Sequence, residues 1–388
     1  MTEEGQPKKK KRGLLRIIIS FTSLAVLCYV VISLISGQGL GFSWIGDLFA
    51  ADEHIELTDE YHFNIGRGRV FADLDNALAA AGSLGVQVLS YSGTELLRDS
   101  FQMGTPAISS CNGRAIAFDI GGTGVRVFDS NEIITSVTAN GPIVSASISQ
   151  DGWFTVCAQE GGGYKGTASV YNSNGSMVYK VSLSSGYVLS AVLSPDNRSL
   201  AVLNLTDTGS RITFYHGLDK EDADSAFDYT DGLILDIYYM TNGDLLAVTT
   251  DALILIESAR GTDAVVFSYP SMRLGGYSIS SDFIALHLLD FGIGNRGRLM
   301  TLDSFGNLFG EVATERELIS MSLRDGYVAV MFSDGLFVYD RRLNEIALSD
   351  DSPSAAGVSR LLKLEGSATL VAGDRFAVVV RTEREHSE

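Results

Sequence analysis

From residue 53 onward, short apolar runs alternate with turns rich in Gly, Asn, Asp and Ser. Residues 115–118 and 125–129 form one pair of such runs around a Gly-rich loop, and residues 327–331 and 336–340 form another. Apolar and polar positions alternate within many runs, which is the period of a β-strand. No segment of this region keeps a helical period over several turns. The pattern therefore predicts an all-β region.

The turns recur at a regular spacing. The seven intervals between the first and the last turn cover 298 residues, a mean of about 43. Four short antiparallel strands every 40–45 residues or so are typical of a β-propeller blade. The sequence therefore predicts an all-β fold of the β-propeller class. The turns begin at Asp75, Asn112, Asp151, Asp196, Asn242, Ser281, Asp325 and Gly373.

The number of blades follows from the length of the repeat region. Residues 53–388 number 336, which divides into eight repeats of 42, so we expect eight blades and keep seven as the alternative. After the turn at Gly373 only one further apolar run, residues 376–380, precedes the end of the sequence. We therefore expect the last blade to lack its outer strands. Residues 54–65 are expected to supply them, because ring closure removes exposed sheet edges.

The amino-terminal part has a different character. Residues 17–46 contain no charged side chain, and the first 19 of them would span roughly 28 Å as a helix, close to a bilayer core of about 30 Å. The basic cluster before them predicts a cytoplasmic amino terminus. We expect a cytoplasmic tail (1–16), a transmembrane signal anchor (17–36), a linker (37–52) and an extracytoplasmic propeller (53–388). A cleaved signal peptide is the alternative, although its apolar region is usually shorter.

Charge and cysteine content narrow the functional classes. The formal net charge is −18; because residues 1–16 carry six basic and two acidic groups, the remainder carries −22. Such an acidic surface repels nucleic acids and anionic lipids, which excludes a nucleic-acid partner. Outside the predicted span only Cys111 and Cys157 occur, too few for a disulfide framework. We interpret them as two buried thiols, and a single disulfide between them is the alternative.

Residues 194–201 and 335–340 carry a resemblance to a known group of proteins. They resemble bacterial membrane-anchored propellers of the WD-repeat-like and quinoprotein-like kind, and the chain is similar to an uncharacterised family of single-span propellers. The resemblance implies the fold and is almost silent about function, since propellers include both enzymes and binding platforms. With only Trp44 and Trp153, the chain lacks the repeated tryptophans of true quinoproteins, so we expect no quinone and no other cofactor.

Few residues offer catalytic chemistry. Residues 118–126 resemble the phosphate-binding hairpin of sugar kinases; the alternative is a Gly-rich loop between two strands of a blade, and we favour it because the motif falls inside the repeat. The five histidines are scattered without metal-ligand spacing, and we interpret His287 as a hydrogen-bonded strand residue. We therefore predict no catalytic residue and no metal site.

The function favoured by these observations is an interaction module at the cell surface. Loops that join second to third strands share one face of a propeller, and residues 160–166 and 289–298 are long examples. We expect Tyr164, Lys165 and Arg296 to form part of a binding rim for an envelope protein, a peptide or a small ligand. The alternative is an exported enzyme that acts on cell-wall or carbohydrate material at the axial mouth of the propeller.

Overall fold

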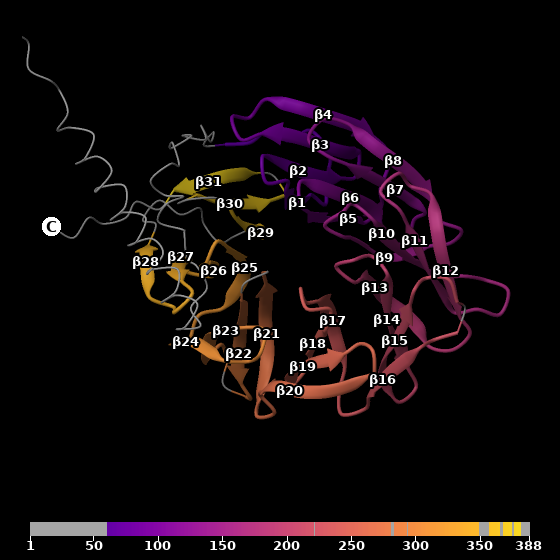
Figure 1. Cartoon of the computed structure of the whole chain (residues 1–388). Coiled ribbons are helices and arrows are strands. Elements are labelled where there is room, and N and C mark those ends of the chain that lie inside the picture. The colour runs from indigo at the N-terminus through magenta and orange to yellow at the C-terminus, as the bar shows by residue number, and fades with distance from the viewer. Residues whose placement is uncertain are drawn as a thin grey trace, which may run out of the picture. The chain divides into compact units, whose positions relative to one another are not determined.

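The computed structural model describes residues 60–220, 222–280, 283–292, 294–348, 357–364, 368–374 and 376–381. Within these ranges the chain forms 31 strands and no helix, arranged as eight antiparallel sheets around a ring (Figure 1). Seven sheets have four strands and the last has three. The predicted eight-bladed β-propeller is therefore confirmed, and the seven-bladed alternative is wrong.

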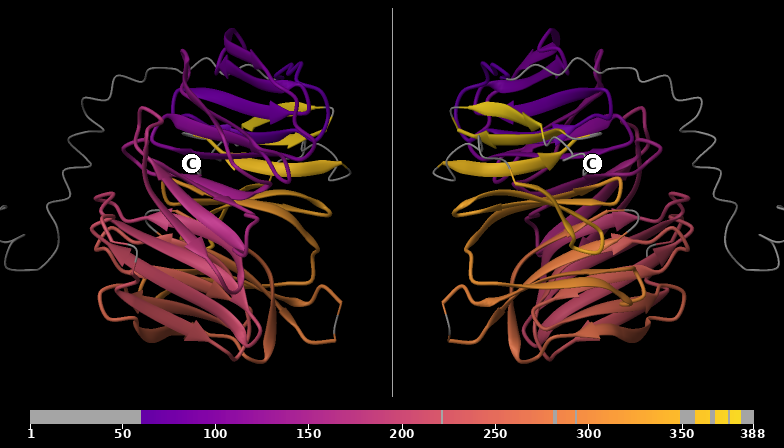
Figure 2. Two further views of the ribbon diagram at one scale, coloured as in Figure 1. Left: turned by 90° about the vertical axis from the view of Figure 1, so that its right-hand side faces the viewer. Right: turned by 90° about the vertical axis from the view of Figure 1, so that its left-hand side faces the viewer.

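Each blade is a run of consecutive strands, and its first strand lies nearest the axis of the ring. Side views show the blades stacked around this axis (Figure 2). The first four blades are β1 (Val70–Asp73), β2 (Ala77–Gly82), β3 (Gly85–Ser90), β4 (Glu95–Ser100); β5 (Pro106–Cys111), β6 (Arg114–Asp119), β7 (Gly124–Phe128), β8 (Ile133–Thr138); β9 (Ile143–Ile148), β10 (Phe154–Ala158), β11 (Gly166–Tyr171), β12 (Met177–Leu183); and β13 (Tyr187–Leu193), β14 (Ser199–Thr206), β15 (Gly209–His216), β16 (Ser225–Tyr229). The last four are β17 (Ile234–Tyr239), β18 (Leu245–Thr249), β19 (Ala252–Glu257), β20 (Thr262–Ser268); β21 (Met272–Ile279), β22 (Ile284–Asp290), β23 (Gly297–Leu302), β24 (Leu308–Thr314); β25 (Leu318–Arg324), β26 (Tyr327–Phe332), β27 (Gly335–Asp340), β28 (Glu345–Leu348); and β29 (Val358–Lys363), β30 (Ala368–Gly373), β31 (Ala377–Arg381).

The core lies between neighbouring blades. The second strands β2, β10, β18 and β30 are buried along their whole length, because both of their faces pack against other blades. In one such interface, Leu203 and Phe214 of the fourth blade pack with Ile237 and Ala247 of the fifth. Each blade thus covers the apolar face of the next, which no blade achieves alone.

Hairpins between third and fourth strands use a recurring carboxylate or amide. In the seventh blade Asp340 accepts hydrogen bonds from the backbone N–H groups of Arg342 (2.8 Å) and Asn344 (2.9 Å), and the Asn344 side chain donates to the same carboxylate at 2.8 Å. Asp303 and Asn307 repeat this arrangement in the sixth blade. Partial burial raises the pKa of Asp303 and Asp340, but these hydrogen bonds outweigh it and hold the pKa of both carboxyl groups below the ordinary value.

The ring closes through the amino-terminal end of the described chain. Glu60 pairs antiparallel with Val378 of β31, the Tyr61 N–H donates to the carbonyl of Ala377 at 2.7 Å, and the Tyr61 hydroxyl donates to the carbonyl of Tyr91 at 2.7 Å. The predicted closure is therefore confirmed for Glu60 and Tyr61, while residues 54–59 lie outside the described residues.

The turn at Gly373 requires a correction. Seven of the predicted turns join a first strand to a second, but Gly373 ends β30 and leads into β31, the third strand of its blade. Among the described residues, the last blade therefore has three of its four strands, and not only the inner ones. The misassignment arose because consecutive hairpins of a blade carry the same Gly/Asp turn chemistry, so composition does not distinguish them.

The predicted cytoplasmic tail, transmembrane segment and linker (1–16, 17–36 and 37–52) lie outside the described residues. Within the part of the chain that the structure describes, no helix has the length and apolar character required to cross a membrane.

Candidate functional site

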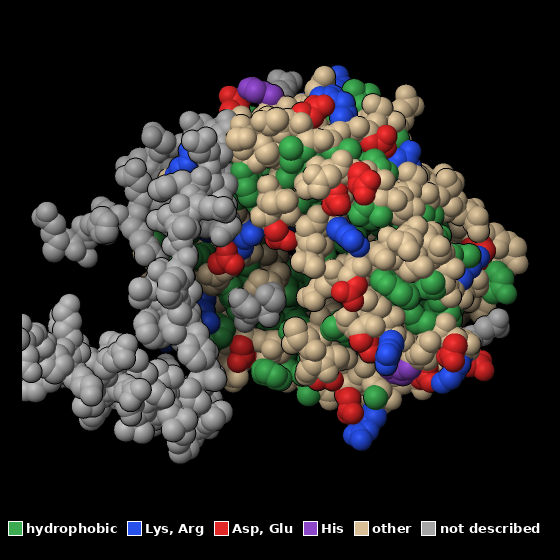
Figure 3. Space-filling view, turned by 45° about the horizontal axis from the view of Figure 1, so that its top comes forward, with side chains coloured by type: hydrophobic (Ala, Val, Ile, Leu, Met, Phe, Trp, Pro, Cys, Tyr) green, Lys and Arg blue, Asp and Glu red, His purple; other side chains and the backbone are tan. Residues whose placement is uncertain are grey.

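The first strands of the blades line an axial channel with two cavities. One has a volume of about 500 Å³ and is lined by β5, β9, β13 and β17; the other, of about 580 Å³, is lined by β1, β5, β21, β25 and β29 together with Tyr238 of β17. Ser109, Ser110 and Tyr238 border both cavities, so the two cavities adjoin each other within the ring. The space-filling view shows acidic and basic side chains around a hollow in the ring (Figure 3).

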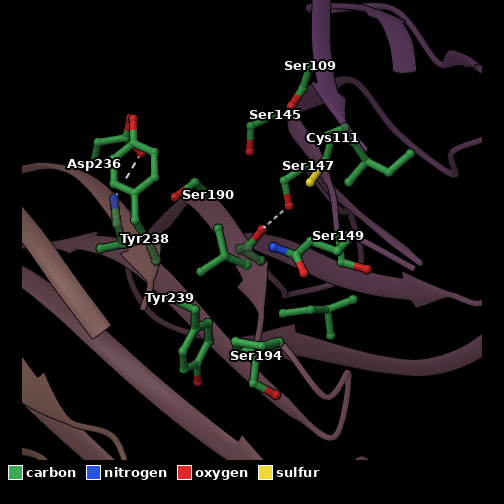
Figure 4. A pocket seen from close by; sticks show the side chains of 18 of the residues that line it. Ser109, Cys111, Ser145, Ser147, Ser149, Ser190, Ser194, Asp236, Tyr238 and Tyr239 are labelled. Atoms are coloured by element: carbon green, nitrogen blue, oxygen red, sulfur yellow. Dashed lines mark hydrogen bonds between the residues drawn. The ribbon is translucent and has the colours of Figure 1, made fainter. Parts of the chain in front are cut away.

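Serine hydroxyls dominate the first cavity (Figure 4). Two of them join the third and fourth blades: Ser145 donates to the carbonyl of Leu189, and Ser147 donates to the carbonyl of Ala191, both at 2.8 Å. Others are not used in this way. The hydroxyls of Ser149, Ser190 and Tyr239 are buried and have no hydrogen-bond partner among the described residues. These three hydroxyl groups were not predicted from the sequence, because no local sequence feature distinguishes a serine or tyrosine that faces the channel from any other strand residue. Buried hydroxyls without partners are suited to a polar ligand or to water.

Charged residues dominate the second cavity. The Arg324 guanidinium forms ion pairs with Asp73, with Asp75 at 3.6 Å and with Asp325 at 3.4 Å. The Tyr91 hydroxyl donates to the carboxylate of Asp73 at 2.8 Å. This network joins the seventh blade to the first across the point of ring closure, and its charges are satisfied within the protein.

Two further cations come from β29. Lys363 is almost completely buried, and its Nζ donates to the carbonyls of Leu364 (2.7 Å) and Ala368 (3.0 Å); burial lowers the pKa of this amine to about 8. Arg360 differs, because solvent in the channel reaches it and it has no hydrogen bond or ion pair with any residue that the structure describes. Its surroundings still remove part of its hydration, and this burial lowers the pKa of the guanidinium.

The channel wall formed by the fifth and sixth blades carries an acidic group. Asp236 accepts hydrogen bonds from the hydroxyl of Tyr238 at 2.5 Å and from the hydroxyl of Tyr277 at 3.1 Å. Burial first, and the Asp236 charge second, raise the pKa of both tyrosines well above the ordinary value. The carboxylate is therefore engaged by two neutral phenols. Among the described residues no group of His, Cys, Asp and Glu side chains is arranged to hold a metal ion.

The predicted rim residues lie on the opposite face from the channel cavities. The cavities lie toward the ends of the first strands, whereas Tyr164 and Lys165 belong to the loop between β10 and β11, at the start of the neighbouring first strand. Tyr164 is exposed, and Lys165 Nζ lies 5.7 Å from the ring centroid of Tyr187, whose exposed fraction is 59%. Tyr187 was not predicted, because it is the first residue of a strand and its exposure depends on the neighbouring blade. Together these three residues form the tyrosine–lysine cluster.

Arg296 does not join this cluster. It lies between β22 and β23 in the sixth blade, three blades away, and pairs with Asp290 at 3.2 Å. The structure therefore places the three predicted residues on loops of the same kind but does not bring them together.

The sugar-kinase resemblance of residues 118–126 has a structural explanation. The motif is the hairpin between β6 and β7, in which Gly121 has φ = 83°. The Asp119 carboxylate accepts hydrogen bonds from the backbone N–H groups of Gly104 (2.8 Å) and Thr105 (2.7 Å). It thus stabilises the entry to its own blade. The motif is a hairpin loop between two strands of a blade, as the favoured alternative predicted.

The remaining sequence predictions concern the two thiols and His287. Cys111 and Cys157 are free, so no disulfide joins them. Cys157 is buried as predicted, and burial raises the pKa of its thiol to about 12, whereas the prediction is wrong for Cys111, which is only partly buried. His287 lies on β22 as expected, but the predicted hydrogen bond is wrong, because neither ring nitrogen has a partner among the described residues. Gly275 and Phe332 occupy the space beside its ring.

Comparison with known proteins identifies the family. Residues 53–347 match the model of a family of unknown function, DUF5711. The chain belongs to this family. A comparison of the sequence with curated proteins finds no match.

Solved structures share the fold of this DUF5711 protein. The C-terminal WD40 domain of Sif2 is 15% identical with a TM-score of 0.57, and the alignment covers 85% of this chain and 97% of that one. Sqt1 from Saccharomyces cerevisiae is 11% identical with a TM-score of 0.60 (84% and 100% covered). BamB from Moraxella catarrhalis is 16% identical with a TM-score of 0.50 (82% and 95% covered). At these identities the likeness establishes the propeller architecture alone.

Proposed function

We propose that this DUF5711 protein is a membrane-anchored, extracytoplasmic interaction module that binds a protein or peptide of the cell envelope and performs no catalysis. The observation that carries the proposal is the tyrosine–lysine cluster on a face of a rigid, closed ring. Tyr164 and Tyr187 are 48% and 59% exposed. Tyrosine supplies a large contact area at small cost in conformational entropy and is enriched at the centres of protein interfaces.

The anchor and the orientation are proposed from the sequence. The uncharged segment that begins at residue 17 follows six basic residues, and the positive-inside rule then places the propeller outside the cytoplasm. The linker of residues 37–52 would keep the propeller close to the membrane. The net charge of −22 beyond residue 16 favours a partner with a basic surface, because complementary charge accelerates encounter.

Variants of the cluster test the proposal. Tagged full-length protein is cross-linked on living cells and the captured proteins are identified by mass spectrometry, in parallel with the Tyr164→Ala/Tyr187→Ala variant. Because interface tyrosines contribute about 2 kcal/mol or more when they are central, the double variant should reduce capture by at least about tenfold. Far-UV circular dichroism should remain that of the parent protein, since both side chains are exposed.

Phe305→Ala is the matched control. Phe305 is also exposed (61%), but it lies in the turn between β23 and β24, on the opposite face. This variant should capture the partner as well as the parent protein. Capture that is equal for the double variant and the parent protein would refute the proposed surface. Arg296→Ala extends the test across the ring, and reduced capture would place the sixth blade in the same interface.

A further inference from the structure

We propose that the axial channel is a binding site for a small, hydroxyl-rich anion whose carboxylate or phosphate group pairs with Arg360. This site lies toward the opposite face from the tyrosine–lysine cluster and does not depend on the function proposed for that cluster. It is built from the first strands of all eight blades, which bring together residues far apart in the sequence.

The first argument is the unmatched charge of Arg360. Arg324, in the same cavity, is surrounded by three aspartates, and other arginines of the propeller, such as Arg126 and Arg298, pair with carboxylates at 2.8 and 2.6 Å. Arg360 has no such partner among the described residues although it also lines the cavity. An arginine that lines a cavity without a carboxylate partner keeps its charge and its N–H donors available, and an anion in the cavity can pair with it.

The second argument is that the nearby carboxylates are already engaged. Asp73, Asp75 and Asp325 contact Arg324, and Asp236 accepts two tyrosine hydroxyl groups. Lys363 donates to backbone carbonyls. Within the described part of the channel this leaves the Arg360 guanidinium, with its planar set of donors, directed to the cavity. Such a fork binds carboxylate and phosphate in bidentate geometry.

The third argument concerns the remainder of the ligand. Beyond Tyr238 the channel continues into the serine-lined cavity, where the buried hydroxyls of Ser149, Ser190 and Tyr239 have no partner among the described residues (Figure 4). Hydroxyl groups recognise hydroxyl groups, because each donates and accepts. Volumes of about 580 and 500 Å³ fall in the range of small-molecule sites. Sugar acids and sugar phosphates have this combination of one anionic group and several hydroxyl groups.

Calorimetry with defined probes tests the site. Detergent-purified full-length protein is titrated with D-glucuronate, glucose 6-phosphate and, as the uncharged probe, glucose. We expect one or both anions to bind with a dissociation constant of about 1 mM or lower and glucose to bind at least about tenfold more weakly. Preference between the two anions distinguishes a carboxylate from a phosphate site. Failure of both anions to bind, or equal binding of glucose, would overturn the proposal.

Two Arg360 variants separate recognition from a structural role. Arg360→Gln should weaken anion binding at least about tenfold, because charge-assisted hydrogen bonds are lost, while Arg296→Gln, which removes a surface arginine, should bind as the parent protein does. Arg360→Met should weaken anion binding to a similar extent without lowering the melting temperature of the ligand-free protein, since the exposed guanidinium has no partner among the described residues. Unchanged binding by Arg360→Gln, or a lower melting temperature of Arg360→Met, would contradict the assignment.

Discussion

Acidification from about pH 7.5 to about pH 4.5 should destabilise the propeller through His287. Its ring is 1% exposed, lies 6.1 Å from the ring of Phe332 and has no hydrogen-bond partner for either nitrogen among the described residues. Burial, assisted by the charge of Arg273, lowers the pKa of this imidazole from 6.5 to about 4. The folded protein therefore holds His287 neutral at pH values at which the unfolded chain binds a proton.

The sign and the size of the effect follow from linkage. Because the unfolded state binds more protons between about pH 6.5 and pH 4, the free energy of unfolding falls as the pH falls through this window. The difference of about 2.5 between the two pKa values corresponds to at most about 3.5 kcal/mol, at about 1.4 kcal/mol for each pKa unit. Below about pH 4 the contribution of His287 is constant.

The assay compares urea denaturation of the parent protein and of His287→Leu at several pH values, so that the contributions of shared carboxylates cancel. Leucine has a similar volume and no nitrogens to leave unpaired, so the variant should match or exceed the parent protein at pH 7.5 and lead by an additional margin of about 2 to 3 kcal/mol at pH 4.5. His62→Gln, at a histidine whose side chain is 84% exposed, should show no such margin. A difference between parent and His287→Leu that does not change with pH would refute the reasoning.

Three other substitutions test parts of the fold. Tyr61→Phe should lower stability by about 1 kcal/mol and Tyr61→Ala by about 3 to 5 kcal/mol, because Tyr61 is buried at the ring closure; equal effects in urea denaturation would argue against a role for its hydroxyl. Arg324→Met should cost about 2 kcal/mol, since it leaves Asp73 (side chain 14% exposed) without its cation, and a neutral result would show that the network contributes nothing. Asp340→Ala should cost about 1 kcal/mol by removing the hairpin hydrogen bonds, and no loss would contradict the structural role of this carboxylate.

The repeat could be predicted because its signals are local. Turn residues such as Asn112 and Asp325 mark where a first strand reverses, and both adopt positive φ there (49° and 52°). Alternating apolar runs identify the strands between turns, and the repeat period identifies the blade. The turn at Gly373, which was assigned to the wrong pair of strands, shows the limit of such signals, because one hairpin of a blade resembles the next.

The candidate site could be predicted only in part. Tyr164 and Lys165 were predicted because a long Gly-rich loop surrounds them, but Tyr187 is brought beside Lys165 by the packing of one blade on the next. Arg360 gave no signal at all, since its lack of a partner depends on where strands of distant blades place their carboxylates. His287 was misjudged for the same reason, because the sequence does not show that no donor or acceptor reaches its ring.

Site-specific photo-cross-linking in living cells tests the central claim most directly. A photoreactive amino acid is placed at Tyr164, at Tyr187 and, on the opposite face, at Phe305, and adducts are resolved by gel mobility and mass spectrometry. We predict one reproducible envelope protein or peptide bound to positions 164 and 187 and absent from position 305. Adducts of the same composition at all three positions, or no adduct at 164 and 187 while the protein is present at the cell surface, would contradict the proposed interaction face.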